Sequence, residues 1–317
     1  MSGHHHDHTG SDHSHGVSAD ANQRYLAIAL GLILGFMAVE VAAGLIAHSL
    51  ALLSDAAHML TDAAAIGLSL WAARLALRPA RGAMTYGFRR AEILSAQANG
   101  ITLLLLAILI VIEAIRRLLA PPDVDAGLIL AIAMVGIVVN VAATWVLARA
   151  NRQSLNVEGS FQHILTDLYA FIGTAVAACV ILATGFNRAD PIASLFVAAL
   201  MLRAAYFLLK ASGRIFLEAA PEGIDVEAVG QALAEQPGVV EVHDLHIWEV
   251  TSGFPALSAH VLVEEKADCH EARRDLDRLL HDRFQLTHTT LQVEHCRPSL
   301  VELQSGRLRR RGDSRTG

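Results

Sequence analysis

Cysteine is scarce in this chain of 317 residues, which has only Cys179, Cys269 and Cys296. Three scattered cysteines cannot build a disulfide framework, so the soluble parts are expected to lie on a reducing face. A signal peptide is also missing. The first 23 residues are rich in His, Asp, Ser and Gly, and they contain neither a basic start nor a short apolar core. These absences make a secreted, disulfide-stabilised protein an unlikely class.

Hydrophobic residues make up 53% of the chain, which is too apolar for an ordinary soluble domain. They are unevenly spread, with long Leu/Ala/Val/Ile runs between about Arg24 and Lys210 and a soluble composition from Pro221 to Arg297. We therefore predict four regions: a disordered, His-rich cytoplasmic tail over 1–23, a six-span transport domain over 24–212, a cytoplasmic globular domain over 213–298, and a disordered basic tail over 299–317.

Six apolar runs reach the roughly 20 residues that a helix needs to cross a bilayer. They cover about 25–47, 49–73, 93–118, 126–147, 160–184 and 191–209. The connections on one side carry ten basic residues and those on the other carry three, Arg116, Arg117 and Arg188. The positive-inside rule places the ten, and with them both chain termini, in the cytoplasm.

The C-terminal region alternates between helical and strand patterns. Polar helices are predicted over 226–235 and 270–283, and strands over 239–250, 256–264 and 290–295. This α-β-β-α-β order is typical of a ferredoxin-like sheet with helices on one face. The predicted fold is an all-α transmembrane bundle of six helices plus a C-terminal cytoplasmic α+β ferredoxin-like domain.

Two predicted spans repeat the pattern His-x-Leu-Thr-Asp, with His58 and Asp62 in one and His163 and Asp167 in the other. Residues four apart share one helix face, with Cβ atoms about 6 Å apart. The two pairs supply the four nitrogen and oxygen ligands of a tetrahedral zinc site, and two carboxylates balance a 2+ ion. A plainer alternative is that each pair hydrogen-bonds a neighbouring helix. Because ionisable groups inside a membrane are costly and mark ion paths by default, we predict transport of a divalent metal.

Further segments extend the pattern: His48–His58, Tyr86–Glu92, Val242–Trp248 and Leu291–Glu294. With the two motifs, they make the chain similar to the cation diffusion facilitator family of zinc transporters from about Tyr25 to Cys296. The resemblance implies a homodimer in the inner membrane that exports Zn²⁺ in exchange for H⁺ and is not an enzyme. It implies that His58, Asp62, His163 and Asp167 form the transport site, and that a histidine at position 58 favours zinc over cadmium.

The resemblance also implies a cytoplasmic domain that dimerises and binds regulatory Zn²⁺. By family position, the expected ligands are His246, His260 and Glu294, with His288 as a further one. Strand alternation allows His246 and His260 to point to one face. The alternative is that these are ordinary surface histidines.

Two rival functions are a membrane-embedded zinc hydrolase and a membrane-anchored metal sensor. The chain contains no His-Glu-x-x-His motif, and four ligands would leave no open position for catalytic water. Ligands inside the spans argue against a mere anchor. The polar residues Glu40, Asn99 and Asn140 within the spans are expected to pack helices together, and the basic loop 74–90 is expected to meet lipid headgroups, not nucleic acid.

Overall fold

The structure is a computed structural model that describes residues 19–46, 50–120, 126–296, 301–304 and 307–310. The side chains of residues 50–58 lie outside the described part. The chain divides into two units, Met1–Gly213 and Arg214–Gly317. Each unit is described by itself.

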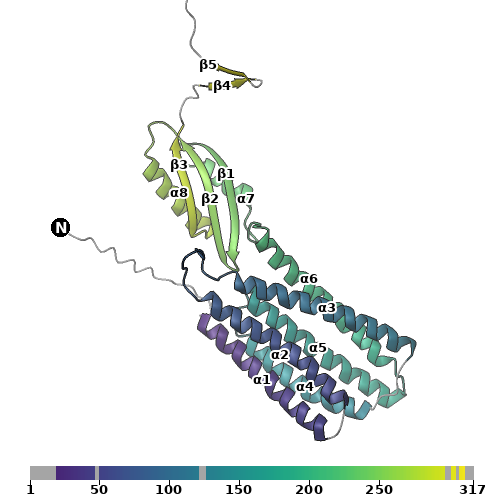
Figure 1. Cartoon of the computed structure of the whole chain (residues 1–317). Helices are drawn as coiled ribbons and strands as arrows, with labels where there is room; N and C mark the ends of the chain where they lie inside the picture. The colour runs from purple at the N-terminus through teal and green to yellow at the C-terminus, as the bar shows by residue number, and fades with distance from the viewer. Residues whose placement is uncertain (1–18, 47–49, 121–125, 297–300, 305–306, 311–317) are drawn as a thin grey trace, which may run out of the picture. The chain divides into compact units, whose positions relative to one another are not determined.

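The first unit contains six helices that are long and apolar enough to cross a membrane (Figure 1). They are α1 (Ala19–Ile46), α2 (Leu50–Ala76), α3 (Ala91–Leu119), α4 (Ala126–Leu147), α5 (Leu155–Thr184) and α6 (Ala189–Phe216). The predicted all-α bundle of six spans is confirmed. Several helices run past the apolar stretches, because polar residues at a helix end can extend it beyond the hydrocarbon region.

The first helix begins earlier than the sequence pattern indicates. We predicted a disordered tail over 1–23, but residues 19–23 already belong to α1. The side chain of Asn22 explains part of this difference, since its Oδ1 accepts a hydrogen bond from the backbone N–H of Asn151 at 2.8 Å. This bond ties the first turn of α1 to the connection between α4 and α5. The remainder of the predicted tail, residues 1–18, lies outside the described residues.

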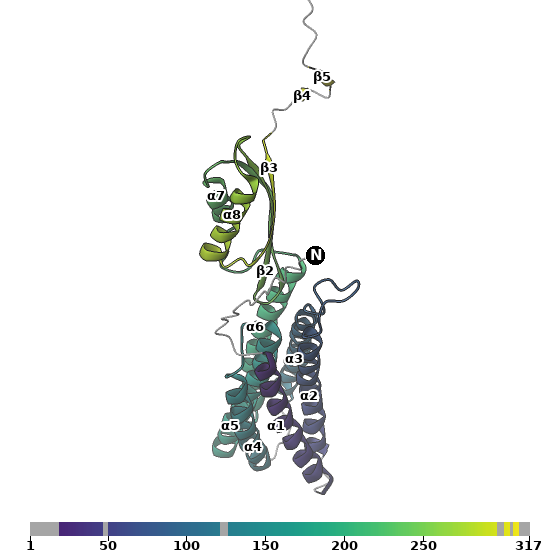
Figure 2. The same cartoon turned by 90° about the vertical axis from the view of Figure 1, so that its left-hand side faces the viewer.

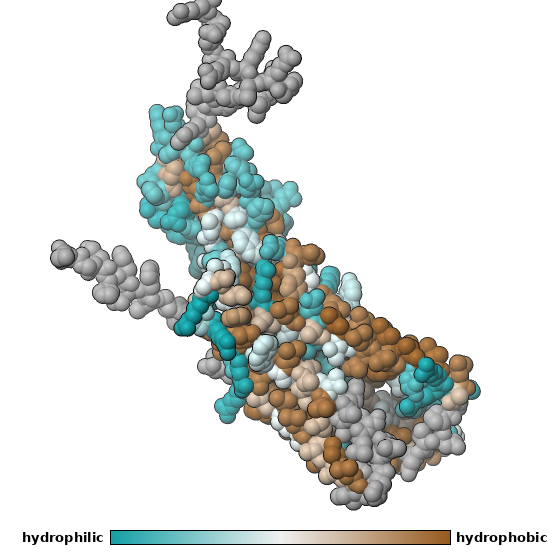
Figure 3. All heavy atoms as spheres, in the orientation of Figure 1, coloured by the Kyte–Doolittle hydropathy of each residue, from teal (hydrophilic) through white to brown (hydrophobic). Residues whose placement is uncertain are grey.

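Two groups of buried side chains hold the helices together. Leu26, Ile33, Ile66, Leu147 and Ile164 belong to one cluster that joins α1, α2, α4 and α5. A second cluster joins α3 to α6. Large apolar side chains cover much of the outer surface of the helices, as the brown spheres over this unit show in Figure 3. A broad apolar surface on a helical bundle is the arrangement expected for contact with lipid.

A buried polar layer connects α2, α3 and α5. The Nδ2 group of Asn99 donates to Ser69 Oγ at 3.0 Å, and Ser95 Oγ lies 3.4 Å from the same oxygen. Asn156 Nδ2 donates to the backbone oxygen of Ser69 at 2.7 Å. Hydrogen bonds of this kind link helices where the hydrophobic effect cannot. The expectation that Asn99 packs helices together agrees with these contacts.

The second unit combines a mixed sheet with two helices. Its main elements are α7 (Val226–Ala234), β1 (Val239–Thr251), β2 (Phe254–Val263), α8 (Cys269–Phe284) and β3 (His288–His295). The sheet order is β1-β2-β3, with β1 antiparallel and β3 parallel to β2. Figure 2 shows α7 and α8 on one face of this sheet. The predicted α+β domain and its α-β-β-α-β order are confirmed.

Alternation along β2 separates the two faces of the sheet. Leu257, Ala259, Val261 and Val263 are buried beneath the helices, in one core with Leu276 and Leu280 of α8. The intervening residues of β2, including His260, face the side that carries no helix of this unit. Beyond this domain, β4 (Val301–Gln304) and β5 (Arg307–Arg310) pair as a short antiparallel ribbon within the range predicted to be a basic tail.

Candidate metal sites

Three of the four predicted transport ligands meet inside the helical bundle. One ligand atom each from Asp62, His163 and Asp167 lies within 4.8 Å of the other two. Asp62 and His163 are 4% and 1% exposed, so water is almost excluded from both side chains. Ligand atoms of a tetrahedral zinc site lie about 3.4 Å apart, as follows from bonds of roughly 2.1 Å. Reaching that spacing would change the separations between the three ligand atoms by at most about 1.4 Å.

The contact between α2 and α5 is direct. His163 Nε2 lies 2.8 Å from Asp62 Oδ1, and the carboxylate accepts a hydrogen bond when that nitrogen carries the proton. The other ring nitrogen, Nδ1, is buried and has no hydrogen-bond partner within the described residues. An imidazole with one uncommitted nitrogen beside two carboxylates has the donor chemistry that a zinc site requires.

His58 is the fourth predicted ligand. Its backbone lies in α2, four residues before Asp62, and its side chain is outside the described part of the structure. Helix geometry places residues four apart on one face, so the position suits a fourth ligand. The assignment of His58 stays a prediction. The hydroxyl of Thr166, which lies next to Asp167 in sequence, donates its proton to the backbone oxygen of Gln162 at 2.7 Å and therefore not to a ligand.

Two of the three ligands, Asp62 and Asp167, line a cavity of about 240 Å³. Asp62, Asp167 and Asn140 supply its ionisable and amide lining. Apolar side chains form much of the remaining wall: Ile33, Met59, Ile129, Ile132, Ala133, Ala170 and Phe171. An apolar wall lowers the local dielectric constant, which strengthens the attraction between the carboxylates and a cation.

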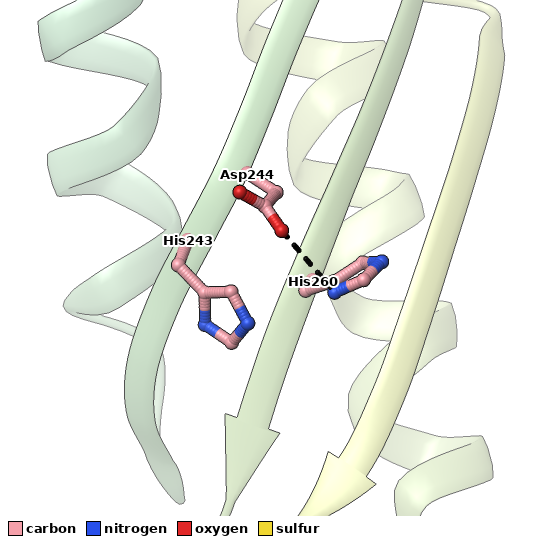
Figure 4. Close-up of side chains that lie close together, drawn as sticks. All are labelled: His243, Asp244 and His260. Atoms are coloured by element: carbon pink, nitrogen blue, oxygen red, sulfur yellow. Dashed lines mark ion pairs between the residues drawn. The ribbon is translucent and has the colours of Figure 1, made fainter. Parts of the chain in front are cut away.

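A second group of metal-ligand type lies in the C-terminal domain, where one ligand atom each from His243, Asp244 and His260 lies within 4.8 Å of the others (Figure 4). His260 Nδ1 lies 3.7 Å from Asp244 Oδ2, and the His243 and His260 rings meet edge to face with centroids 5.3 Å apart. His243 pairs directly with His260 across β1 and β2. Both histidines are partly exposed, so an ion could reach the site from solvent.

An irregularity in β1 brings two consecutive residues to this site. The register shifts between His243 and His246, and Asp244 has a positive φ of 51°. Such a β-bulge re-aims a side chain, and Asp tolerates the left-handed conformation better than most residues. His243 and Asp244 therefore both approach His260, which strict alternation along a strand would not allow.

The structure does not gather the four predicted cytoplasmic ligands into one group. His260 belongs to the group just described, whereas His246 is paired with Ser258 on the same sheet. His288 and Glu294 lie at the two ends of β3, paired with Ala256 and Leu262. His243 and Asp244 were not among the predicted ligands. The adjacent residues His243 and Asp244, followed by His246, were the feature of the sequence that could have indicated a metal site.

Both parts of the chain match models of known protein families. Residues 26–217 match the model of the cation efflux transmembrane domain, and residues 221–296 match that of the cytoplasmic domain of cation efflux proteins. The chain belongs to the cation efflux, or cation diffusion facilitator, family. It is thus a multi-pass membrane transporter and not an enzyme, as the six spans and the two intramembrane motifs predicted.

Two relatives cover nearly all of the chain. The "Cadmium, cobalt and zinc/H(+)-K(+) antiporter" of Bacillus subtilis is 37% identical over 284 residues, 88% of this chain and 91% of its own length. The "Zinc transporter ZitB" of Escherichia coli is 39% identical over 295 residues, 92% of each chain. A solved structure, the metal-bound C-terminal domain of the CzcD transporter, is 36% identical, with a TM-score of 0.22, and covers 22% of this chain and 99% of its own.

Proposed function

We propose that this cation efflux transporter exports Zn²⁺ from the cytoplasm across the inner membrane in exchange for H⁺. The observation that carries the proposal is the meeting of Asp62, His163 and Asp167 in the bundle interior. Together with His58 they would offer two carboxylates and two neutral imidazoles, which neutralise a 2+ ion at membrane depth. The names of the two relatives support zinc as cargo, with cadmium and cobalt as further ions and protons on the opposite side of the exchange.

Proton exchange follows from competition for the same atoms. A contact of 2.8 Å between His163 Nε2 and Asp62 Oδ1 requires a proton between two lone pairs. A metal ion needs those lone pairs for itself, so zinc and this proton exclude one another at the site. Loading zinc on one side of the membrane and protons on the other therefore couples the two flows.

The cavity gives the proposed direction of exit. It is lined by the first half of α4 and by the second half of α5, through residues such as Ile129, Ile132 and Thr174. With both termini in the cytoplasm, these helix halves face outward. We infer from this lining that protons reach Asp62 and Asp167 from the outer side and that the displaced ion leaves there.

The C-terminal site would serve regulation rather than transport. Zinc held by His243, Asp244 and His260 would reach it from the cytoplasm, because these side chains lie on the face of the sheet that no helix of this unit covers. We propose that this face takes part in a homodimer, in which a partner group or water completes the coordination sphere. Metal on it alters transport only if the affinity differs between transport states.

Zinc flux in proteoliposomes tests the proposal. The full chain is reconstituted with a zinc indicator inside, and zinc is added outside with and without an imposed pH gradient. Acid inside the vesicles should accelerate zinc entry through transporters whose cytoplasmic side faces out. Zinc entry that ignores the pH gradient would overturn proton coupling, and the absence of zinc entry at any gradient would overturn zinc as cargo.

A further inference from the structure

Asn140 of α4 lies at the depth of the proposed transport site. The start of α2, the start of α4 and the end of α5 lie at the same end of the bundle. Asp62 is 12 residues from that end along α2, Asn140 is 14 residues from it along α4, and Asp167 is 17 residues from it along α5. At 1.5 Å per residue, the three lie about 18 to 26 Å from the same end of the bundle. All three line the same cavity. The amide of Asn140 therefore faces the space in which an ion bound to the two carboxylates would sit.

The orientation of this amide is determined by its surroundings. Asn140 Nδ2 donates to the backbone oxygen of Gly136 at 3.0 Å. Exchanging the two ends of the amide would set one oxygen against another, so the nitrogen must face Gly136. The carbonyl oxygen Oδ1 is then the other end of the amide, and it is buried without a hydrogen-bond partner within the described residues.

A buried acceptor without a partner is costly and calls for an explanation. Asn140 is only 1% exposed, so bulk water does not supply the missing partner. The packing of α4 on α5 keeps this geometry rigid. A Cβ atom at Gly136 would stand 2.5 Å from the ring of Phe171, which means that only glycine allows this approach. The amide is thus held in place with its oxygen uncommitted.

We propose that Asn140 Oδ1 is an additional, neutral oxygen ligand of the transported ion and sets which ions the transporter accepts. The inference rests on the proposed function, and Asn140 had been expected from sequence only to pack helices. Zinc is satisfied by four ligands, whereas cadmium and cobalt accept larger coordination numbers, with ligand number and geometry as the means of selection. A fifth oxygen therefore favours cadmium and cobalt more than it favours zinc.

Asn140→Leu removes the oxygen while keeping a side chain that branches at Cγ. We expect zinc flux into proteoliposomes to stay within about threefold of the unsubstituted protein, and cadmium and cobalt flux to fall at least tenfold, the lower range for losing a supporting ligand contact. Asn99→Leu is the matched control, since Asn99 is also 1% exposed on a spanning helix but does not line the cavity. It should change the flux of all three ions by one common factor.

A spectroscopic measurement reports on coordination itself. Cobalt is bound to the full chain carrying His243→Ala and His260→Ala, so that the C-terminal site does not contribute. Tetrahedral cobalt absorbs visible light more strongly than five-coordinate cobalt, so adding Asn140→Leu should strengthen the absorption. Should the leucine variant fail to fold, Asn140→Gln decides, because it keeps a neutral amide oxygen and should retain cadmium and cobalt flux, with ratios to zinc within about threefold of the original.

An unchanged zinc-to-cadmium flux ratio with an unchanged cobalt spectrum in Asn140→Leu would overturn the proposal. A loss of cadmium and cobalt flux in Asn140→Gln equal to that in the leucine variant would also overturn it. Failure of the proposed function is a separate result, since the unsubstituted protein would then move no zinc or move it without protons.

Discussion

Asp62→Asn offers a direct test of the transport site, because it removes one charge and little else. The asparagine has nearly the same shape, and its side-chain oxygen can still accept a hydrogen bond from His163 Nε2. The empty transporter should therefore fold and insert normally. With zinc bound, however, the site would carry a net positive charge at a position that is 4% exposed.

The expected size of the effect follows from the burial of this charge. Removing one partner of a buried ion pair costs about 3–5 kcal/mol. Since 1.4 kcal/mol is a tenfold change in an equilibrium constant, the zinc affinity of the transport site should fall about 10²- to 10⁴-fold. The zinc concentration for half-maximal flux should rise accordingly in Asp62→Asn.

Zinc uptake into proteoliposomes, measured with a fluorescent indicator over a range of zinc concentrations, provides the assay. Glu113→Gln is the matched control, since Glu113 is also a carboxylate on a spanning helix but is 51% exposed and paired with Arg117. That variant should transport like the original protein. A half-maximal zinc concentration in Asp62→Asn within threefold of the original would refute the assignment of Asp62 as a ligand.

Three further predictions concern the other motifs. His58→Asp should raise cadmium flux relative to zinc, because a carboxylate changes the charge and geometry of the ligand set; equal ratios in parallel flux assays would count against His58. His243→Ala with His260→Ala should remove one zinc ion per chain in calorimetry of the full protein and slow transport without stopping it, whereas His246→Ala should leave the stoichiometry unchanged; an unaltered stoichiometry in the double variant would exclude this site. The backbone N–H groups of Glu271 and His270 donate to Asp268, the N-cap of α8, and hold its pKa below the ordinary value of 3.8. The cap therefore stabilises the folded state above pH 3.8, and this stabilisation is lost as the pH falls through the lowered pKa. Hydrogen exchange in the first turn of α8 should quicken over that acid range, and Asp268→Asn should remove the pH dependence.

The amino-acid sequence predicts the membrane part well because each span must satisfy its own backbone within a long apolar helix. Spacing alone also predicts the site in α2 and α5, since residues four apart on a helix share a face whatever surrounds them. The limits of the spans were harder to predict. The beginning of α1 at Ala19 depends on a contact between Asn22 and Asn151, which are 129 residues apart.

Strand alternation was a weaker guide in the C-terminal domain. It correctly indicates that His246 and His260 lie on one sheet, but it does not anticipate the bulge at which Asp244 turns into a positive φ. A single inserted residue redirects the side chains on either side of it, so His243 and Asp244 replace His246 beside His260. The uncommitted oxygen of Asn140 was equally hidden, because it depends on which way one amide is turned by the backbone of Gly136.

In the proposed mechanism, zinc and protons exclude one another at Asp62 and His163 and therefore move in opposite directions. Proteoliposomes that contain both a zinc indicator and a pH indicator measure the two flows in the same sample. Zinc entry should raise the internal pH as protons leave, with the same onset and the same dependence on zinc concentration, and Asp62→Asn should shift both signals together to higher zinc concentrations. Zinc entry at a constant internal pH in vesicles without a leak would contradict the account.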